Sequence, residues 1–140
     1  MDRDIQVSFN SDQQVVTDVV KQSIAWLNTH DVEADLAANA EIVLAEALNN
    51  IVEHAFEFQP TGQIDLSAEL SELNLTFMLK DNGKVFPGIP QKKEMKGAEI
   101  AFEDLPEGGF GWFLIHELTE QIAYARLEDQ NALQLQLARG

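Results

Sequence analysis

Polar and apolar residues alternate along five short segments of the chain, and an alternation with period two predicts β-strands. The first segment is DIQVSF at residues 4–9. After a turn at residues 60–62, QIDLSAEL and NLTFMLKD alternate over 63–70 and 74–81, and the short SEL connection predicts an antiparallel hairpin. QIAYARL and ALQLQLA form a second such pair near the C-terminus, joined by a predicted turn over residues 128–131.

Two longer segments repeat their apolar residues at helical spacing. The first helix is predicted to follow a cap at Ser11 or Asn10, and the second runs from near Asp31 or Asp35 to about Phe56. Their apolar positions are Val15, Val16, Val19, Val20, Ile24 and Leu27 in the first, and Leu36, Ala40, Val43, Leu44, Ala47, Leu48, Ile51 and Ala55 in the second. A third, brief apolar helix is predicted in GWFLIHELTE, residues 111–120.

The order of these elements predicts the fold class. Strand, helix, helix, two strands, a long connection, a helix and two strands indicate one α+β domain over residues 1–140. We expect a two-layer α/β sandwich with a mixed, mostly antiparallel sheet and helices on one face. Residues 82–111 contain three of the four prolines and most of the glycines, and a connection of this length in a compact domain is usually functional.

Composition excludes several classes of function. The chain has 24 acidic against 9 basic residues and a net charge of −15, which repels nucleic acid backbones and anionic membranes. There is no cysteine, so disulfides, cysteine-based zinc sites and thiol catalysis are excluded. The start of the chain lacks a signal-peptide pattern, and no apolar run approaches the roughly 20 residues that span a bilayer. We expect a cytoplasmic protein that binds neither nucleic acid nor membrane directly.

The second predicted helix carries an unusual set of polar residues in AEALNNIVEHAF, residues 45–56. Glu46, Asn50 and His54 follow at i, i+4 and i+8 and so line one stripe, with Asn49 and Glu53 beside it. A polar stripe is ordinarily a solvent-facing surface, but asparagine is a poor helix former. A carboxylate and an amide oxygen one turn apart can also serve as a general base and a ligand for a hard cation.

Two further segments have the composition of ligand-binding loops. In LKDNGKVFPG, residues 79–88, Asp81 ends a strand before Gly83, which is typical of a turn. Alternatively, Asp81 accepts a hydrogen bond from an exocyclic amine while Gly83 lets a flat ring approach the backbone. In EGGFGWFLIHEL, residues 107–118, glycines lead into a helix whose N-terminal N–H groups can bind phosphates, although the segment is neither a P-loop nor a Rossmann fingerprint.

Taken in order, these three segments resemble the nucleotide site of the gyrase/Hsp90/histidine kinase/MutL ATPase superfamily. The similarity is greatest to the small bacterial anti-sigma factor serine/threonine kinases. In that family a helical Glu-Ala-x-x-Asn-x-x-x-His-(Ala/Gly)-aromatic motif precedes Asp-x-Gly and then Gly-x-Gly-x-x-(Leu/Ile)-(Ile/Met). Here EALNNIVEHAF, DNG and GFGWFLI match those forms. The resemblance covers nearly the whole chain and implies a Bergerat-type, histidine kinase-like ATPase fold.

The resemblance also implies a role for individual residues. Glu46 would be the general base, Asn50 would hold Mg²⁺, and Asp81 would recognise the adenine amino group of ATP. Residues of about 84–107 would close over the nucleotide as a lid. The residues implied to contact the nucleotide are Asn49, Asn50, His54, Asp81, Gly83, Phe86, Gly108, Gly109, Phe110 and Gly111.

The implied function is an ATP- and Mg²⁺-dependent serine/threonine protein kinase that acts as an anti-sigma regulatory factor. Its expected substrate is a serine of an anti-anti-sigma partner of the STAS type, a sigma factor is a second candidate partner, and a homodimer is the expected assembly. The catalytic domain of a two-component histidine kinase is a weaker alternative because no phospho-accepting dimerisation segment is found. An acidic scaffold without nucleotide would leave the three motifs unexplained.

Two positions depart from the family pattern. Val85 stands where the family often has a second glycine after Asp-x-Gly, and Asn131–Ala132 stands where it often has Gly-Thr. Neither position is Glu46 or Asn50. The departures leave a second function open, an ATP-binding regulatory module that sequesters a partner without phosphotransfer.

Overall fold

The structure, a computed structural model, describes residues 3–85 and 109–139, with side chains described from residue 112 onward in the second range. The predicted order of elements is confirmed. The elements are β1 (Asp4–Asn10), α1 (Gln13–Asn28), α2 (Ala34–Asn50), a π-helical turn η1 (Ile51–Ala55), β2 (Gln63–Leu70), β3 (Asn74–Asp81), α3 (Gly109–Leu118), β4 (Gln121–Leu127) and β5 (Gln130–Ala138).

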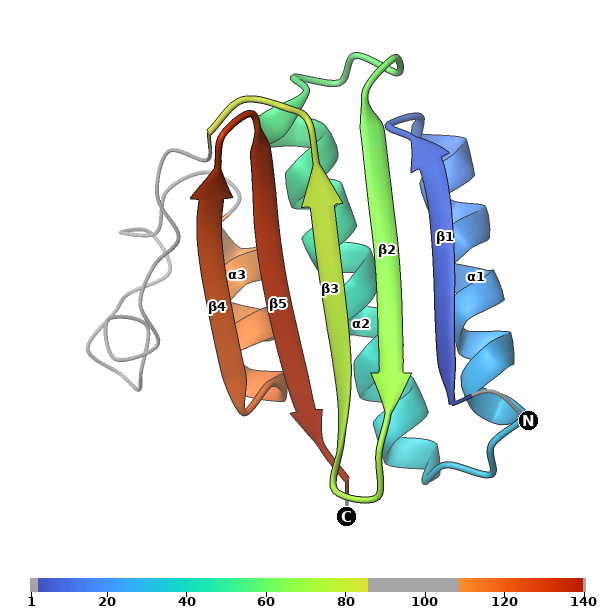
Figure 1. The fold of residues 1–140 in the computed structure, drawn as a ribbon. Coiled ribbons are helices and arrows are strands. Elements are labelled where there is room, and N and C mark those ends of the chain that lie inside the picture. The colour runs from blue at the N-terminus through green and yellow to red at the C-terminus, as the bar shows by residue number, and fades with distance from the viewer. Residues whose placement is uncertain (1–2, 86–108, 140) are drawn as a thin grey trace.

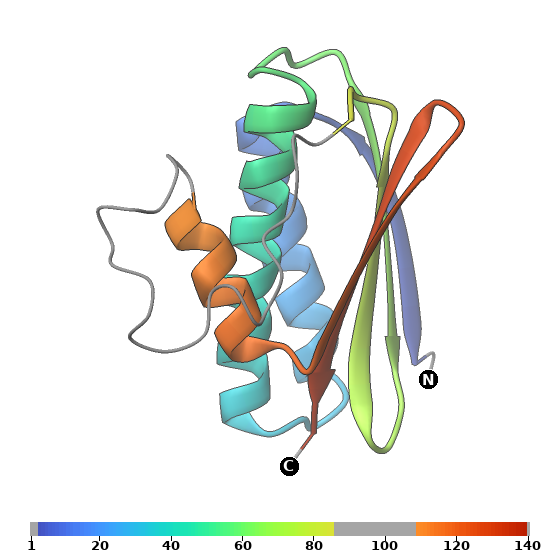
Figure 2. The ribbon, with the colours of Figure 1, turned by 90° about the vertical axis from the view of Figure 1, so that its left-hand side faces the viewer.

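The strands form one sheet in the order β1-β2-β3-β5-β4, and α1, α2 and α3 all cover the same face of it (Figures 1 and 2). This confirms the two-layer α+β sandwich. The four pairings are antiparallel, so the described strands contain no parallel pair where a mixed sheet was expected. The reason is that β4 and β5 form a hairpin, and β5 rather than β4 is the strand that pairs with β3.

The core lies between the sheet and the helices. In α2, the side chains of Val43, Leu44, Ala47 and Leu48 are fully buried, as the helical periodicity predicted. Alternate residues of β2, β3 and β5 point toward them from the sheet. Full burial of each Val or Leu side chain contributes roughly 1.5–3 kcal/mol. This packing makes α2, which carries the Glu and Asn motif, the central helix of the layer.

The N-terminal cap of α1 differs from the prediction. Asp12, rather than Ser11 or Asn10, is the cap residue, and its Oδ1 accepts from the backbone N–H of Gln14 at 2.8 Å. Ser11 is buried instead, donates its hydroxyl to the carbonyl of Gln59 and accepts from the N–H of Gly62 at 3.0 Å. The prediction was wrong because a long-range contact with the turn before β2 occupies the Ser11 side chain.

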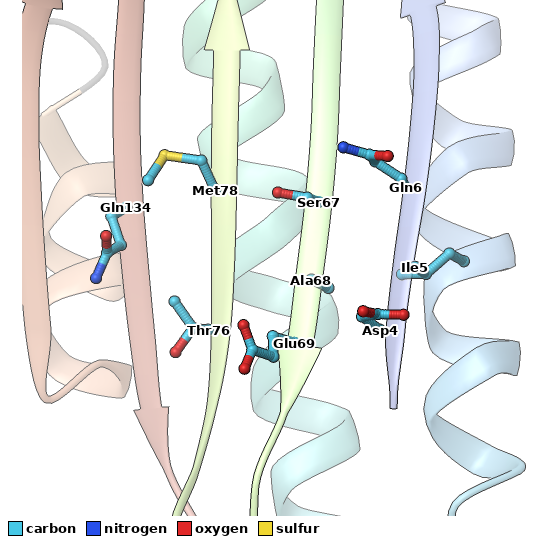
Figure 3. A pocket seen from close by; sticks show the side chains of 9 residues that line it. All are labelled: Asp4, Ile5, Gln6, Ser67, Ala68, Glu69, Thr76, Met78 and Gln134. Atoms are coloured by element: carbon cyan, nitrogen blue, oxygen red, sulfur yellow. The ribbon is translucent and has the colours of Figure 1, made fainter. Parts of the chain in front are cut away.

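None of the described helices covers the opposite face of the sheet (Figure 2). Its side chains are mostly polar, and a shallow hollow there is lined by Gln6, Ser67, Glu69, Met78 and Gln134, among others (Figure 3). Polar side chains on this face and apolar side chains on the other are the pattern of an antiparallel sheet with one solvated face. Within the described parts of the chain, no helix combines the length and apolar character needed to cross a membrane.

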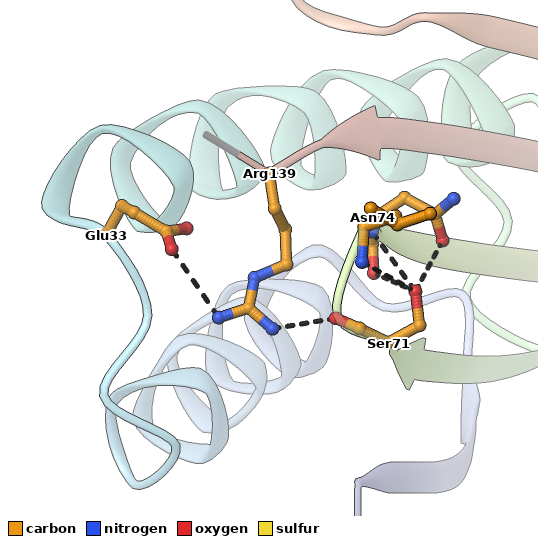
Figure 4. A network of polar contacts seen from close by, with 5 residues as sticks. Glu33, Ser71, Asn74 and Arg139 are labelled. Atoms are coloured by element: carbon orange, nitrogen blue, oxygen red, sulfur yellow. Dashed lines mark hydrogen bonds and ion pairs between the residues drawn. The ribbon is translucent and has the colours of Figure 1, made fainter.

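The end of β5 is anchored by Arg139 (Figure 4). Its Nη1 donates to the carbonyl of Ser71 at 2.7 Å, its Nη2 lies 3.5 Å from Glu33 Oε1, and its backbone N–H donates to the carbonyl of Leu73 at 2.9 Å. Arg139 therefore ties the C-terminal end of β5 to the β2–β3 hairpin and to the start of α2. The first residues of β5 lie at the other end of the sheet, where the candidate site is found.

Candidate functional site

Glu46 and Asn50 lie one turn apart on α2, as their spacing predicted. Glu46 is half-buried and Asn50 is only 4% exposed, whereas Asn49 is exposed to solvent. The α-helical geometry ends at Asn50, and η1 follows with a bond from the N–H of Phe56 to the carbonyl of Ile51 at 3.3 Å. This i to i+5 bond widens the turn, and such π-turns occur often at functional sites.

His54 lies in this π-turn and is half-buried. Its Nε2 lies 3.8 Å from Glu53 Oε2. Both side chains line a hollow with Phe58 and Val85, and the lining of that hollow includes neither Asn50 nor Asp81. The α-helical spacing of the predicted stripe therefore ends at Asn50, and a contact of His54 with a nucleotide stays a prediction.

Asn50 has an unsatisfied polar group. Its side-chain Nδ2 is buried and has no hydrogen-bond partner among the residues that the structure describes. A buried donor without a partner costs roughly 1–3 kcal/mol, and asparagine inside a helix costs more than alanine. The side chain is therefore suited to a ligand that enters this part of α2.

A magnesium ion at Asn50 would have few protein ligands. Among the described residues there is no group of three or more His, Asp or Glu side chains that could hold a metal ion. Mg²⁺ commonly keeps several waters and completes its octahedron with the phosphates of a bound nucleotide. In such a site Oδ1 of Asn50 would be the metal ligand, and the unpaired Nδ2, which is a donor, would face a phosphate oxygen or a water.

Asp81 ends β3 and is 1% exposed. Its Oδ1 accepts from the backbone N–H of Gly83 at 2.9 Å, which confirms the turn, and from Asn131 Nδ2 at 2.9 Å. Its Oδ2 is buried and has no hydrogen-bond partner within the described residues. An ordinary turn aspartate does not need a buried, unpaired oxygen, so Oδ2 fits the predicted acceptor for an exocyclic amine.

Burial raises the pKa of the Asp81 carboxyl above its ordinary value of 3.8. The hydrogen bonds from Asn131 and Gly83 and the positive charge of Arg126 act in the opposite direction and favour the carboxylate. The side chain is therefore a desolvated acid whose ionised form depends on its protein donors.

Gly83 has a packing role that the sequence did not indicate. A Cβ atom at this position would lie 2.5 Å from the carbonyl oxygen and 2.7 Å from the Cβ of Ala55 in η1. The next residue, Lys84, donates its backbone N–H to the same carbonyl at 3.0 Å. The close approach that requires glycine is therefore made to the end of the helix that carries Asn50, and a contact with a flat ring stays a prediction.

Asn131 was predicted to lie in a turn, and this was wrong. The connection between β4 and β5 is Glu128–Asp129 alone, Glu128 has φ of 55°, and Asn131 lies in β5 directly across from Asp81. The side chain is completely buried. Asn131 and Ala132 stand where the resembling family often has Gly-Thr, and the amide of Asn131 donates to Asp81.

Tyr124 and Arg126 are site residues that sequence reasoning missed. The Tyr124 hydroxyl donates to Asn131 Oδ1 at 2.5 Å, and Arg126 Nη1 lies 3.2 Å from the same oxygen. Both residues are on β4, two positions apart, so they share a face. The sequence showed only the alternation that places both residues on one face of a strand. Their contact with Asn131 could be recognised only from the strand register, which pairs Arg126 with Asn131.

The predicted phosphate-binding residues are covered only in part. The helix α3 begins at Gly109, so Gly109, Phe110 and Gly111 form its first turn, where backbone N–H groups have no partner inside the helix. Phe86 and Gly108 lie outside the described residues, as does the predicted lid except for Lys84 and Val85.

The fold places the segments that carry the candidate site residues close to one another. The C-terminal end of α2, the end of β3, the end of β4 and the start of β5 all lie at the same end of the sandwich (Figure 1). Counting described residues only, Asp81 Oδ2 is an acceptor without a partner there, and Asn50 Nδ2 is a donor without a partner on the helix that Gly83 contacts. The arrangement can bind a ligand with an amine donor at one end and a cation or anion complex at the other.

Comparison with protein families gives one match over most of the chain. Residues 9–137 match the model described as the histidine kinase-like ATPase domain. A serine-protein kinase RsbW of Bacillus thuringiensis is 34% identical over 95 residues, which are 66% of this chain and 59% of that protein. A serine-protein kinase RsbW of Oceanobacillus iheyensis is 32% identical over 84 residues, 59% of this chain and 53% of that protein. The chain thus matches a little over half the length of these relatives.

Solved structures give the same fold at low identity. The histidine kinase AdeS of Acinetobacter baumannii has a TM-score of 0.50 and 16% identity, with 97% of this chain and 68% of that chain covered. The mycobacterial sensor histidine kinase MprB has a TM-score of 0.50 and 14% identity, with 96% of this chain and 98% of that chain covered. These two likenesses support the fold alone.

Proposed function

Because this chain belongs to the histidine kinase-like ATPase domain family, we propose that it binds ATP with Mg²⁺ and acts as an anti-sigma-type serine/threonine protein kinase. The observation that carries the proposal is the buried Oδ2 of Asp81, which has no hydrogen-bond partner in residues 3–85 and 109–139. This oxygen can accept a hydrogen bond, and it lies at the position where the family motif predicts the adenine amino group. The proposal includes an anti-anti-sigma partner with a target serine, a homodimer and a cytoplasmic location.

Adenine binding follows from the acceptor character of Asp81. A carboxylate oxygen accepts a hydrogen bond from the 6-amino group of adenine but repels the 6-oxo group of guanine or hypoxanthine. Burial strengthens both effects, because an unpaired polar group away from water costs more than an exposed one. Asp81 would therefore bind the base and select it.

The phosphate end depends on residues of α2 and α3. Asn50 would hold Mg²⁺ through its amide, and the first turn of α3 would donate backbone N–H groups to the phosphates. When bound, Mg²⁺ neutralises phosphate charge, which this acidic chain needs because its net charge is −15. The half-buried Glu46, one turn before Asn50, would accept the proton of a serine hydroxyl that approaches the phosphate.

The proposal that the protein transfers phosphate to serine is supported by relatives that are named serine-protein kinases, with 32% and 34% identity. The presence of Glu46 also supports it, since a module that only binds nucleotide needs no carboxylate beside the metal ligand. A serine-bearing anti-anti-sigma protein as substrate and a sigma factor as a further partner follow from the family resemblance.

The second candidate is an ATP-binding regulatory module that sequesters a partner without phosphotransfer. The observation in its favour is Val85, which is 52% exposed at the position where the family often has glycine, directly before the predicted lid. A β-branched side chain restricts the backbone more than glycine does. A lid that moves less would still allow binding while impeding a catalytic step.

Nucleotide binding is tested by thermal unfolding of the wild type with ATP and Mg²⁺, with ATP and a chelator, and without ligand. We expect a rise in melting temperature with ATP and Mg²⁺ together, because a ligand that binds only the folded state stabilises it. Asn50→Ala should lose most of this rise, whereas Asn49→Ala, the exposed neighbour on the same helix, should keep it. An unchanged wild-type melting temperature at millimolar ATP and Mg²⁺ would contradict the proposal.

A further inference from the structure

We propose that Asn131, Arg126 and Tyr124 are positioning residues that leave one oxygen of Asp81 available to the ligand and thereby set the selectivity for a 6-amino purine. The inference rests on the proposed nucleotide binding and adds to it the origin of base selection. The three side chains come from β4 and β5, and neither the motifs nor the family resemblance assigns them a role. We refer to Asn131, Arg126 and Tyr124 together as the β4–β5 clamp.

Asn131 is completely buried, and every hydrogen-bonding position of its side chain is used inside the protein. Its Nδ2 donates to Asp81 Oδ1 at 2.9 Å and to the carbonyl of Lys84 at 2.8 Å. Its Oδ1 accepts from the Tyr124 hydroxyl at 2.5 Å and from Arg126 Nη1 at 3.2 Å. An amide side chain has two donor hydrogens and one acceptor oxygen with two lone pairs. Asn131 therefore has nothing left to offer a ligand, and its effect must pass through Asp81.

The clamp determines which way the amide of Asn131 faces. Arg126 can only donate, so the atom of Asn131 beside it must be the oxygen, and the nitrogen must then face Asp81. This assignment follows from the chemistry of the arginine side chain, which has no acceptor and stays charged. Arg126 thus sets the donor that reaches Asp81, although no hydrogen bond joins Arg126 to Asp81 directly.

The result is a carboxylate with one oxygen occupied and one oxygen available. Asp81 Oδ1 receives two donors, from Gly83 and Asn131, while Oδ2 is buried without a partner in the described part of the chain. With Oδ1 held on both sides, the carboxylate cannot rotate to share its oxygens between ligand and protein. An ionised oxygen held in this way accepts from an amino group and repels an oxo group, whereas a protonated carboxyl could also donate its O–H to an oxo group.

The clamp also holds the backbone that follows β3. Arg126 Nη1 donates to the carbonyl of Gly83 at 2.7 Å, and Asn131 Nδ2 donates to the carbonyl of Lys84. On its other side the same backbone is bound to η1, through the N–H of Lys84 and the carbonyl of Ala55. Residues 83 and 84 are therefore fixed between β4–β5 and the helix of Asn50, so a base bound at Asp81 is placed relative to that helix.

The test measures the affinities of ATP and of inosine triphosphate, each with Mg²⁺, by titration calorimetry. The two nucleotides differ at position 6 of the base, which carries an amino group in one and an oxo group in the other. The variants are Asn131→Asp, which keeps the shape of the side chain but replaces the donor to Asp81 by an acceptor, and Arg126→Gln. Tyr124→Phe is a milder variant that removes one hydroxyl and keeps the arginine. Gln134→Glu is the matched control, because it makes the same change from amide to acid on β5 but faces the open side of the sheet.

We expect the wild type to prefer ATP to inosine triphosphate by at least about tenfold, the size of one charge-assisted hydrogen bond. Asn131→Asp and Arg126→Gln should lower this preference about tenfold, Tyr124→Phe should lower it less, and Gln134→Glu should leave it unchanged. A purely structural role would weaken both nucleotides by the same factor and keep their ratio, and that result would overturn the inference. If Asn131→Asp does not fold, an unchanged ratio in both Tyr124→Phe and Arg126→Gln has the same meaning.

The outcomes separate this inference from the proposed function. A wild type that binds neither nucleotide overturns both proposals. A wild type that binds ATP and inosine triphosphate equally well keeps the proposed ATP binding and overturns the role of the clamp. A ratio that falls in the clamp variants and stays constant in Gln134→Glu supports both.

Discussion

Asn131 Nδ2 lies 2.9 Å from Asp81 Oδ1, and the two residues are direct cross-strand partners in the β3–β5 pair. The contact joins residues 50 positions apart in the chain, and both side chains are almost completely buried. Asp81 is therefore held as one member of a buried polar network, and this network determines which of its atoms can meet a ligand.

Replacement of Asp81 by asparagine should change stability in a pH-dependent way. Because burial raises the pKa of Asp81, the folded protein binds the proton more tightly than the unfolded chain does. Ionisation of Asp81 therefore destabilises the fold. This destabilisation is complete when the pH is above the raised pKa, and it is absent when the pH is below the unfolded value of 3.8. We expect Asp81→Asn to be more stable than the wild type at pH 7 by about 1 kcal/mol. The gain should shrink toward pH 4 in urea unfolding curves, and a gain of equal size at both pH values would contradict this account.

The same substitution should reverse the preference for the base. Asparagine can keep its oxygen toward Gly83 and Asn131, which places its –NH₂ group where Oδ2 was. The –NH₂ group at that place donates a hydrogen bond to the 6-oxo group of inosine triphosphate and leaves the amino group of ATP without an acceptor. We expect the ratio of the two affinities to invert, by about tenfold or more from the wild-type value. Competition between the two nucleotides for one labelled analogue measures this, and an Asp81→Asn protein that still prefers ATP would exclude Asp81 as the base-selecting residue.

Glu46→Gln should separate binding from catalysis. The substitution keeps the size and polarity of the side chain but removes its ability to accept a proton. We expect ATP affinity within about twofold of the wild type and a loss of serine phosphorylation by about 10²–10⁴, the usual contribution of a general base. The measurement is phosphoserine formation on a small partner protein captured from the host, followed by mass spectrometry. Equal rates in both proteins would rule out Glu46 as the base, and no transfer by the wild type to any captured partner would favour the binding module.

Gly83→Ala should destabilise the fold even without nucleotide. The added Cβ would meet backbone atoms of Ala55 at 2.5 Å, and backbone cannot move aside as a flexible side chain can. Overpacking of this kind costs typically about 1–3 kcal/mol. Chemical unfolding of the ligand-free protein measures the loss. Lys84→Ala is the control, because it removes only an exposed ion pair with Glu57, which water and salt screen, and should leave stability nearly unchanged.

Asp12→Ala should weaken the N-terminus of α1. The Asp12 carboxylate accepts from two backbone N–H groups that have no partner inside the helix, those of Gln14 and Val15. Loss of such a cap costs about 1 kcal/mol. Thermal unfolding should show the decrease for Asp12→Ala and little change for Asn10→Ala, because the structure gives Asn10 no capping role. A decrease for Asn10→Ala and little change for Asp12→Ala would instead support Asn10 as the cap, as the sequence suggested.

Much of the fold could be predicted because local patterns of polar and apolar residues determine it. The buried faces of α2, β3 and β5 follow from helical or alternating spacing of apolar residues, and these patterns hold wherever one face of an element is packed. The pairing of β5 with β3 could not be predicted in this way, because the alternation in β4 and β5 is equally compatible with either neighbour. The cap at Asp12 was missed for a related reason, since a distant turn binds Ser11.

Of the candidate site, the sequence by itself determined the chemistry of single residues: a carboxylate and an amide one turn apart on a helix, and an aspartate before a glycine. The tertiary structure alone decided how these groups are constrained. The register of β3, β5 and β4 aligns Asp81, Asn131 and Arg126 in one row, and a π-turn begins directly after Asn50. Hydrogen-bond partners across strands depend on long-range pairing rather than on spacing along the chain, so a buried oxygen without a partner becomes visible only after the chain has folded.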